Sequence, residues 1–107
     1  MFCLLNINNL SFLFILVYTE ISAEDFSYAL QATKRATIVG ETTSGGAHPT
    51  GQFDVGQGFL AFIPHSCSIS PITKTDWEGT GVIPDVQVPA DQALQKAIEL
   101  IVDAKSK

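Results

Sequence analysis

A serine, a carboxylate and closely spaced glycines are the residues of this chain that could do chemistry. Ser22 stands where an apolar run gives way to a helical pattern, and Glu78 lies between Trp77 and Gly79. Backbone N–H groups and the dipole at a helix N-terminus stabilise developing negative charge, which favours a nucleophilic hydroxyl. A carboxylate can orient a histidine or another general base. The pair indicates a hydrolytic centre, while a helix cap for Ser22 and a solvated turn acid for Glu78 are the simpler interpretations.

The loop over residues 41–51 carries a second candidate site. Gly45 and Gly46 either let a backbone approach a bound peptide closely or supply a positive φ at a turn. No Gly-Lys-Ser/Thr follows them, so the loop is not a phosphate-binding loop. His48 and His65 each adjoin a proline and lack a carboxylate at metal or triad spacing, which favours a structural or solvated role. Neither a metal nor a cofactor is expected.

Composition narrows the class of protein. A chain of 107 residues forms one domain or part of one, and an apolar fraction of 46% argues against disorder. With 6 basic and 11 acidic residues the net charge is −5, and no basic stripe is present. Binding to nucleic acid or to an anionic membrane surface is therefore not expected. Cys3 and Cys67 lack metal-ligand spacing and are interpreted as free thiols, with a disulfide as the alternative.

The N-terminal segment admits two interpretations. The apolar run 10–18 is shorter than the roughly 20 residues of a membrane-spanning helix. It fits either the core of a signal peptide ending near Ala23, which would mean a secreted or periplasmic-type location, or a buried parallel strand. No Lys or Arg precedes the run, which favours the strand. The first nine residues fit neither pattern.

The elements that must position these residues form an α/β pattern. A strand over 12–18, a helix over 22–34 capped by Ser22, and a strand over 36–39 make a right-handed βαβ unit with parallel pairing. The apolar stripe of the helix is predicted from Phe26, Ala29, Leu30 and Thr33.

The second part of the chain adds antiparallel structure and a helix. Strands 52–55 and 59–63 around a Gly56–Gly58 turn predict a hairpin, and 65–70 alternates like a further strand. Next come a loop over 71–84, an extended piece over 85–88 and a helix over 89–104 with its apolar face at Ala90, Ala93, Leu94, Ala97, Ile98 and Ile101. A sheet built from these pieces alone would expose apolar edges at 12–18 and 36–39, so the chain is interpreted as the second half of a larger domain.

Several linked motifs carry a resemblance to a known family. They are Ser22–Leu30, Lys34–Thr43, Gly45–Pro49, and Pro71–Thr73 continuing through Val88–Pro89. Over these residues the chain resembles the tail-specific, or C-terminal-processing, serine peptidase family. It is most similar to the branch of the tricorn core protease and the interphotoreceptor retinoid-binding protein repeats.

The resemblance implies a partial crotonase-like α/β sandwich that hydrolyses peptide bonds in peptides or proteins. Residues 20–107 would be the C-terminal portion of the protease domain, whereas 1–19 match poorly. Ser22 would be the nucleophile, Glu78 the carboxylate supporting an upstream histidine, and Gly45 and Gly46 would contact substrate.

The chain departs from the family at the catalytic positions. Counting back from Phe26 puts the nucleophile at Ile21 instead of Ser22, and one helical residue is about 100° of rotation. The lysine that serves many members as base would fall close to Gly46 and is absent, as is the upstream half with its histidine. We therefore expect no peptidase activity from this chain. The alternatives are a non-catalytic module for peptides or hydrophobic ligands, compatible with the apolar segment 59–63, and a fragment that does not fold alone.

Overall fold

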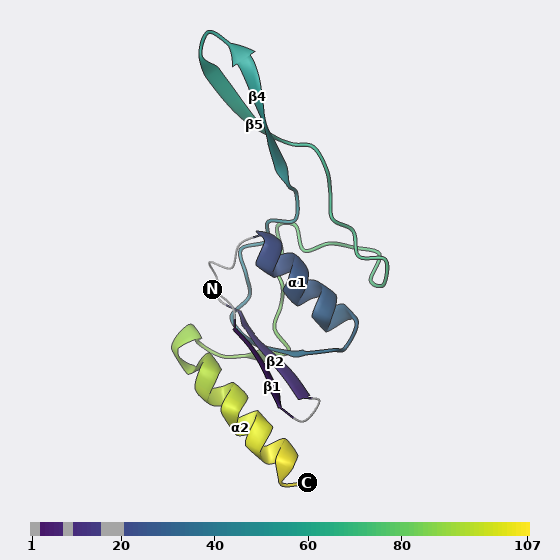
Figure 1. The fold of residues 1–107 in the computed structure, drawn as a ribbon, viewed down its shortest axis with the longest axis vertical. Coiled ribbons are helices and arrows are strands. Elements are labelled where there is room, and N and C mark those ends of the chain that lie inside the picture. Colours follow the sequence, from purple (N-terminus) through teal and green to yellow (C-terminus); the bar gives the residue numbers. More distant parts are fainter. Residues whose placement is uncertain (1–2, 8–9, 16–20) are drawn as a thin grey trace.

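The computed structural model describes residues 3–7, 10–15 and 21–107, and its main element is a four-stranded sheet in the order β1-β2-β3-β6 (Figure 1). The strands are β1 (Cys3–Ile7), β2 (Leu10–Ile15), β3 (Thr37–Gly40) and β6 (Val86–Gln87). β1 pairs antiparallel with β2, whereas β2–β3 and β3–β6 are parallel. The predicted α/β class is confirmed.

The predicted strand–helix–strand unit is present with shifted bounds. Helix α1 (Ile21–Ala32) connects β2 to β3, and Leu13 lies opposite Ile38 in the parallel register. β2 begins two residues earlier than expected, and positions 16–18 of the predicted strand fall outside the described residues.

The expectation of an exposed apolar edge at 12–18 is wrong for residues 12–14, because β1 pairs with β2 there. The expected edge at 36–39 is covered only at its end, where β6 pairs with Val39 and Gly40. β1 was not predicted, because its residues have no recognisable strand pattern. It pairs nonetheless, because an antiparallel ladder needs only backbone groups in register. The sheet edges are therefore β1 and the two-residue β6.

Two cores lie on opposite faces of the sheet, because successive strand residues point to opposite sides. On one face, Ile38 belongs to a buried cluster formed by Leu13, Ile15, Ile38, Ala47, Trp77 and Val82. Tyr28 and Leu30 of α1 are partly buried and pack against this cluster. On the other face Val39 packs against α2. Figure 1 shows the two helices on either side of the strands.

Helix α1 differs from its prediction at the start and along its buried face. It begins at Ile21, so Ser22 is its second residue and not its N-cap. Glu24 and Ser27 are buried, whereas Phe26, placed in the predicted apolar stripe, is 41% exposed. Burial of Ser27 is tolerated because its Oγ donates to the Ala23 carbonyl at 2.6 Å.

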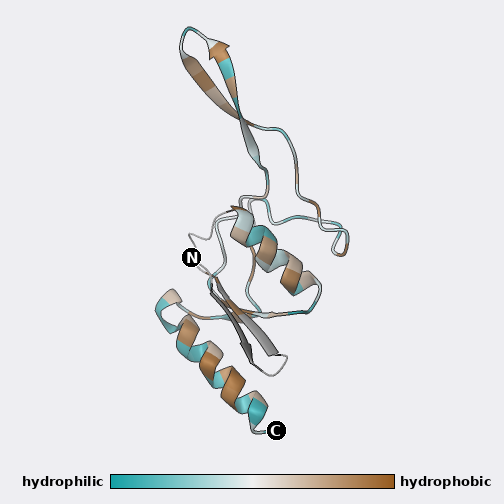
Figure 2. Cartoon of the chain, in the orientation of Figure 1, coloured by the Kyte–Doolittle hydropathy of each residue, from teal (hydrophilic) through white to brown (hydrophobic). Residues whose placement is uncertain are grey.

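Helix α2 (Ala93–Lys105) follows a 3₁₀ turn, η1 (Ala90–Gln92), and confirms the predicted C-terminal helix. Its buried row is Ala93, Ala97 and Ile101, at helical spacing. The predicted face was too wide, since Leu94 and Ile98 are 53% and 42% exposed. Figure 2 shows hydrophobic bands alternating with hydrophilic ones along α2.

The predicted hairpin is confirmed and projects away from the rest of the fold (Figure 1). It consists of β4 (Thr50–Gly56) and β5 (Phe59–Pro64), which pair antiparallel. The turn uses positive φ at Gly56, Gln57 and Gly58. With this projection the molecule extends 64 × 30 × 20 Å.

The strand predicted over 65–70 does not form. Instead Ser70 starts a turn, in which the Lys74 amide donates to the Ser70 carbonyl at 2.9 Å and the Ser70 amide donates to the Thr75 carbonyl at 3.0 Å. Alternating serines therefore did not indicate a strand here, because backbone groups at one end of the segment pair locally. In the described part of the chain, no helix is long and apolar enough to cross a membrane.

Candidate active site

Glu24 is a buried carboxylate that binds the glycine loop. Its side chain, 1% exposed, accepts a hydrogen bond from the Gly45 amide at 2.8 Å on one oxygen and from the Gly46 amide at 2.9 Å on the other. Such charge-assisted hydrogen bonds compensate the cost of burying the carboxylate. The first turn of α1 is thereby tied to the loop.

Glu78 binds the next amide of the same loop. Its Oε2 accepts from the Ala47 amide at 2.6 Å. Two carboxylates from distant segments thus hold three consecutive N–H groups, those of Gly45, Gly46 and Ala47. The amides of both glycines point at Glu24 in this conformation.

His48 lies between two carboxylates. Its Nδ1 is 3.7 Å from Glu78 Oε1, and its Nε2 is 3.6 Å from Asp76 Oδ2. The sequence spacing predicted only a structural or solvated histidine, because no carboxylate is near His48 along the chain. The fold supplies both carboxylates from a loop far along the sequence. His65 lies at the base of the hairpin, where its amide donates to the Pro49 carbonyl at 3.3 Å.

The start of α1 faces the glycine loop through Ile21, not through Ser22. A Cβ built on Gly46 would lie 3.1 Å from Ile21 Cγ1 and 3.6 Å from Glu24 Oε2. Ser22 is exposed, and within the described residues no hydrogen bond joins it to Glu78. The helix start and Glu78 nevertheless meet the same loop, at Gly46 and at Ala47.

Two glycines allow the loop over 43–47 to lie directly against the loop over 77–82. The Gly79 amide donates to the Gly45 carbonyl at 2.9 Å, and Gly45 has a φ of +87°. A Cβ on Gly45 would lie 2.7 Å from the Gly81 amide nitrogen, and a Cβ on Gly81 would collide with the Thr43 carbonyl. Gly81 has a φ of +74°, a conformation that glycine adopts without strain.

Trp77 is a core residue. It is 1% exposed, and its ring centroid lies 5.0 Å from that of Tyr28. Its Nε1–H has no hydrogen-bond partner among the described residues. The side chain therefore anchors the loop that carries Glu78 to the sheet.

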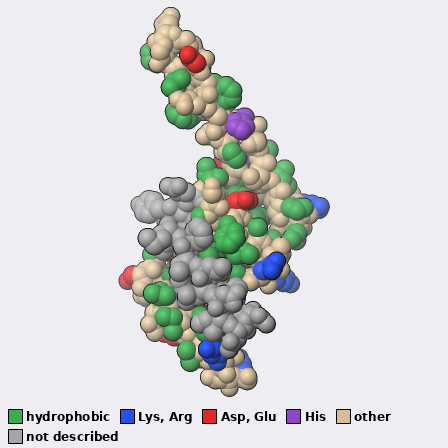
Figure 3. Space-filling model, in the orientation of Figure 1, with side chains coloured by type: hydrophobic (Ala, Val, Ile, Leu, Met, Phe, Trp, Pro, Cys, Tyr) green, Lys and Arg blue, Asp and Glu red, His purple; other side chains and the backbone are tan. Residues whose placement is uncertain are grey.

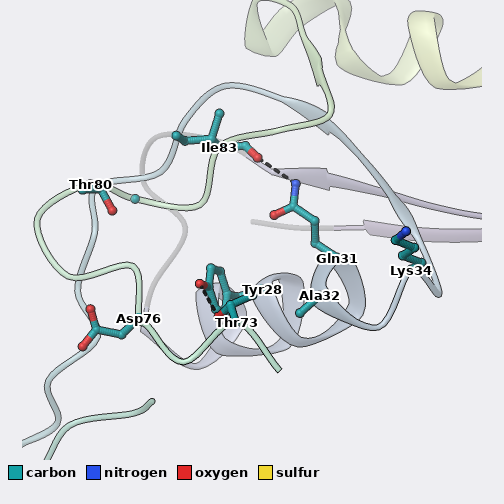
Figure 4. A pocket seen from close by; sticks show the side chains of 9 residues that line it. Tyr28, Gln31, Ala32, Lys34, Thr73, Asp76, Thr80 and Ile83 are labelled. Atoms are coloured by element: carbon teal, nitrogen blue, oxygen red, sulfur yellow. Dashed lines mark hydrogen bonds between the residues drawn. The ribbon is translucent and has the colours of Figure 1, made fainter. Parts of the chain in front are cut away.

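A hollow of about 540 Å³ lies between α1 and the loop over 73–83 (Figure 4). At its floor the Tyr28 hydroxyl is 2.9 Å from Thr73 Oγ1. Gln31 Nε2 donates to the Ile83 carbonyl at 2.8 Å and to Asp85 Oδ1 at 3.1 Å, which fixes the orientation of its amide. This site was not apparent from the sequence, because its lining comes from two segments far apart in the chain.

The sequence also did not identify the structural role of three other polar side chains. Asp85 Oδ2 accepts from the Ile38 amide at 2.8 Å, Thr43 Oγ1 accepts from the Val82 amide at 2.8 Å, and Glu41 Oε1 accepts from the Ala90 amide at 3.1 Å. The only sequence signal was their position in loops beside buried strands. Cys67 is a free and exposed thiol, whereas the side chain of Cys3 is outside the described part.

Comparison with protein families shows which family contains the segment that forms this site. The profile of Peptidase family S41 matches residues 12–88, well over half of the chain. The chain belongs to Peptidase family S41. It is a serine-peptidase-like domain, for which peptides or proteins are the substrate class. The matched region runs from β2 through β6 and contains the loops with Gly45, Gly46 and Glu78, while α2 lies beyond it.

Proposed function

We propose that this chain is a serine-peptidase-like domain of Peptidase family S41 that does not hydrolyse peptide bonds by itself. One observation supports this most directly: Ile21 packs against Gly46. The family resemblance aligns the nucleophile with Ile21 and the lysine base close to Gly46. An apolar side chain and a bare Cα thus occupy two adjoining positions where the family has a hydroxyl and an amine.

Ser22 and Glu78 are the remaining candidates for a catalytic pair, and their roles are part of the proposal. Ser22 is one residue, or about 100° of helix rotation, away from the position that faces the loop. Both ring nitrogens of His48 face carboxylates, so neither is directed at a hydroxyl. A serine without a base at hydrogen-bond reach is a weak nucleophile.

An active-site probe tests this proposal. We expect a fluorophosphonate probe to leave the purified chain unlabelled, and we expect peptide hydrolysis to stay at the buffer rate. The Ser22→Ala variant should be indistinguishable from the parent in both assays. Labelling or turnover that disappears in Ser22→Ala would show that the nucleophile has been retained, and the proposal would be wrong.

A peptide-binding module is the second candidate, and the hollow beside α1 favours it. Its volume of about 540 Å³ is in the usual range of ligand sites, roughly 300–1,000 Å³. Hydroxyls of Tyr28 and Thr73 and the fixed amide of Gln31 line it, and these groups can hydrogen-bond a peptide backbone. The predicted substrate contact of Gly45 and Gly46 stays part of this proposal, although the space beside their Cα atoms is taken by the Gly81 backbone and by Ile21.

Titration calorimetry with short peptides checks the second candidate. Saturable binding that is lost when Ala32→Trp fills the hollow would support it. The control is Ala104→Trp, on the exposed side of α2 away from the hollow. Equal binding by both variants would mean that the peptide binds outside the hollow.

Assignment to the tricorn and retinoid-binding branch is likewise a proposal, resting on Glu78 and the surrounding motif.

A further inference from the structure

A second, smaller cavity shares Tyr28 with the hollow beside α1. Its volume is about 140 Å³, and it is lined by Asp25, Tyr28 and Ala29 of α1, by residues 68–71 and by Trp77. Sites for whole small molecules usually measure roughly 300–1,000 Å³. A cavity of this smaller size therefore suits a single side chain of a larger ligand.

Asp25 places an unpaired carboxylate at this cavity. It shares a face of α1 with Tyr28 and Ala29, because residues three and four apart are neighbours on a helix. The Tyr28 hydroxyl lies 2.9 Å from Thr73 Oγ1, so this face is turned toward the loop that closes the cavity. Within the described residues, no hydrogen bond or ion pair involves the Asp25 side chain. No lysine or arginine is among the described lining residues, so the charge of Asp25 is not neutralised there.

Two aromatic residues also line the cavity. The ring centroids of Tyr28 and Trp77 are 5.0 Å apart, with their planes inclined by 42°. The electron-rich faces of aromatic rings attract ammonium and guanidinium groups. Ala29, Ile69 and Pro71 add apolar surface, against which the methylene groups of a lysine or arginine side chain can pack. A carboxylate, aromatic rings and apolar surface together favour a basic side chain as the ligand.

Trp77 carries a second, independent indication of a ligand. Its side chain is 1% exposed, and its Nε1–H has no hydrogen-bond partner among the described residues. Buried N–H groups are nearly always paired in folded proteins, because an unpaired one costs free energy. A carbonyl oxygen of a bound peptide is an acceptor that the described part of the chain does not supply.

We propose that this cavity binds the basic side chain of a peptide whose backbone lies in the hollow beside α1. The Asp25 carboxylate pairs with the ammonium or guanidinium group, and Tyr28 and Trp77 provide the aromatic surface. This inference rests on the second candidate function, peptide binding in the hollow, and adds the class of side chain that is selected. On the face shown in Figure 3 the acidic side chains stand singly, so a cation meets no broad acidic patch there.

Two peptides that differ only in charge test the selection. A blocked alanine pentapeptide with lysine at its centre is compared by titration calorimetry with the same peptide carrying norleucine, an uncharged side chain of similar length. We expect the lysine peptide to bind about fivefold more tightly, because the carboxylate and the aromatic rings attract the cation alone. The preference should fall as salt is added, because Asp25 is exposed and its charge is screened.

Two matched variants locate the charge that is responsible. Asp25→Asn should abolish the preference for lysine and leave binding of the norleucine peptide unchanged. Asp103→Asn makes the same charge change at an exposed residue of α2 that does not line the cavity, so it should keep the preference. Urea denaturation of both variants checks that neither change affects folding.

The single tryptophan gives a signal from the cavity that does not depend on peptide binding in the hollow. The indole N–H resonance of Trp77 is followed by NMR while n-butylammonium is added. We expect a saturable shift in the parent and in Asp103→Asn, and no shift in Asp25→Asn. The uncharged control n-butanol, which has the same carbon chain, should leave the resonance in place.

The outcomes separate this inference from the proposed peptide-binding module. Equal binding of the two peptides, or a preference that survives Asp25→Asn, would overturn the inference and leave the module standing. Failure of both peptides to bind would overturn the module, whereas a Trp77 resonance that n-butylammonium does not shift would overturn the cation site itself. Binding of n-butylammonium as tight as that of the lysine peptide would make a free amine the ligand and exclude a peptide side chain.

Discussion

Ile21 at the start of α1 packs against Gly46 in the glycine loop. A Cβ at Gly46 would lie 3.1 Å from Ile21 Cγ1 and 3.8 Å from Ile21 Cδ1. The two positions therefore adjoin, although they come from a helix and a distant loop. The resemblance aligns the family nucleophile with Ile21 and the lysine base close to Gly46, and this contact brings the two positions together.

The paired change Ile21→Ser with Gly46→Lys tests that link. Serine at position 21 removes both Ile21 atoms that a side chain at position 46 would meet. We expect fluorophosphonate labelling at position 21 in the double variant. Gly46→Lys alone should give no labelling and should lower the thermal midpoint, because the new Cβ crowds Ile21. An unlabelled but folded double variant would show that more of the catalytic apparatus is absent than these two groups.

Replacement of Glu24 measures how strongly the glycine loop is held. In Glu24→Gln one amide oxygen can still accept, but the NH₂ group then faces the second backbone N–H. We expect a loss of about 2–4 kcal/mol in the free energy of unfolding, read from urea denaturation. The matched control is Asp25→Asn, one residue along on the exposed side, which should change stability by less than about 0.5 kcal/mol. Equal effects at both positions would contradict the role assigned to Glu24.

Gly81 and Gly79 form a matched pair for the close approach of two loops. Both have positive φ, +74° and +69°, so alanine is strained at either position. A Cβ at Gly79 meets nothing within 4 Å, whereas one at Gly81 collides with the Thr43 carbonyl. Gly79→Ala should cost about 1 kcal/mol and Gly81→Ala about 3 kcal/mol of unfolding free energy. Similar costs for the two variants would mean that the loops separate without penalty.

Lys34, two residues beyond the end of helix α1, has the left-handed conformation usually taken by glycine. Its φ is +55°, and the Arg35 amide donates to the Leu30 carbonyl at 2.9 Å, as at a Schellman-type helix end. Lys34→Gly should raise stability by about 0.5–1 kcal/mol, because relief of the strain exceeds the added entropy of the unfolded chain. The thermal midpoint would rise by about 2–8 °C. Arg35→Gly, at a residue without positive φ, should instead lower it.

The local elements were predictable because each depends on residues only a few positions apart. Apolar residues at helical spacing identified α2, and Gly56 and Gly58 identified the hairpin turn. The parallel pairing of β2 and β3 followed from the strand–helix–strand order. Errors occurred where a residue's environment overrides its local pattern, as with Phe26, which is exposed on a helix whose buried positions include Glu24.

The sequence by itself determined the α/β pattern, the hairpin, the C-terminal helix and the order of motifs that place the chain in Peptidase family S41. Only the tertiary structure decided the partners of the polar groups. It set Glu24 against Gly45 and Gly46, and it placed His48 between Asp76 and Glu78. These partners come from segments far apart in the chain. They meet because the loop over 43–47 lies against the loop over 77–82. Helix and strand patterns carry no information on that contact, because they reflect burial and spacing within a single element.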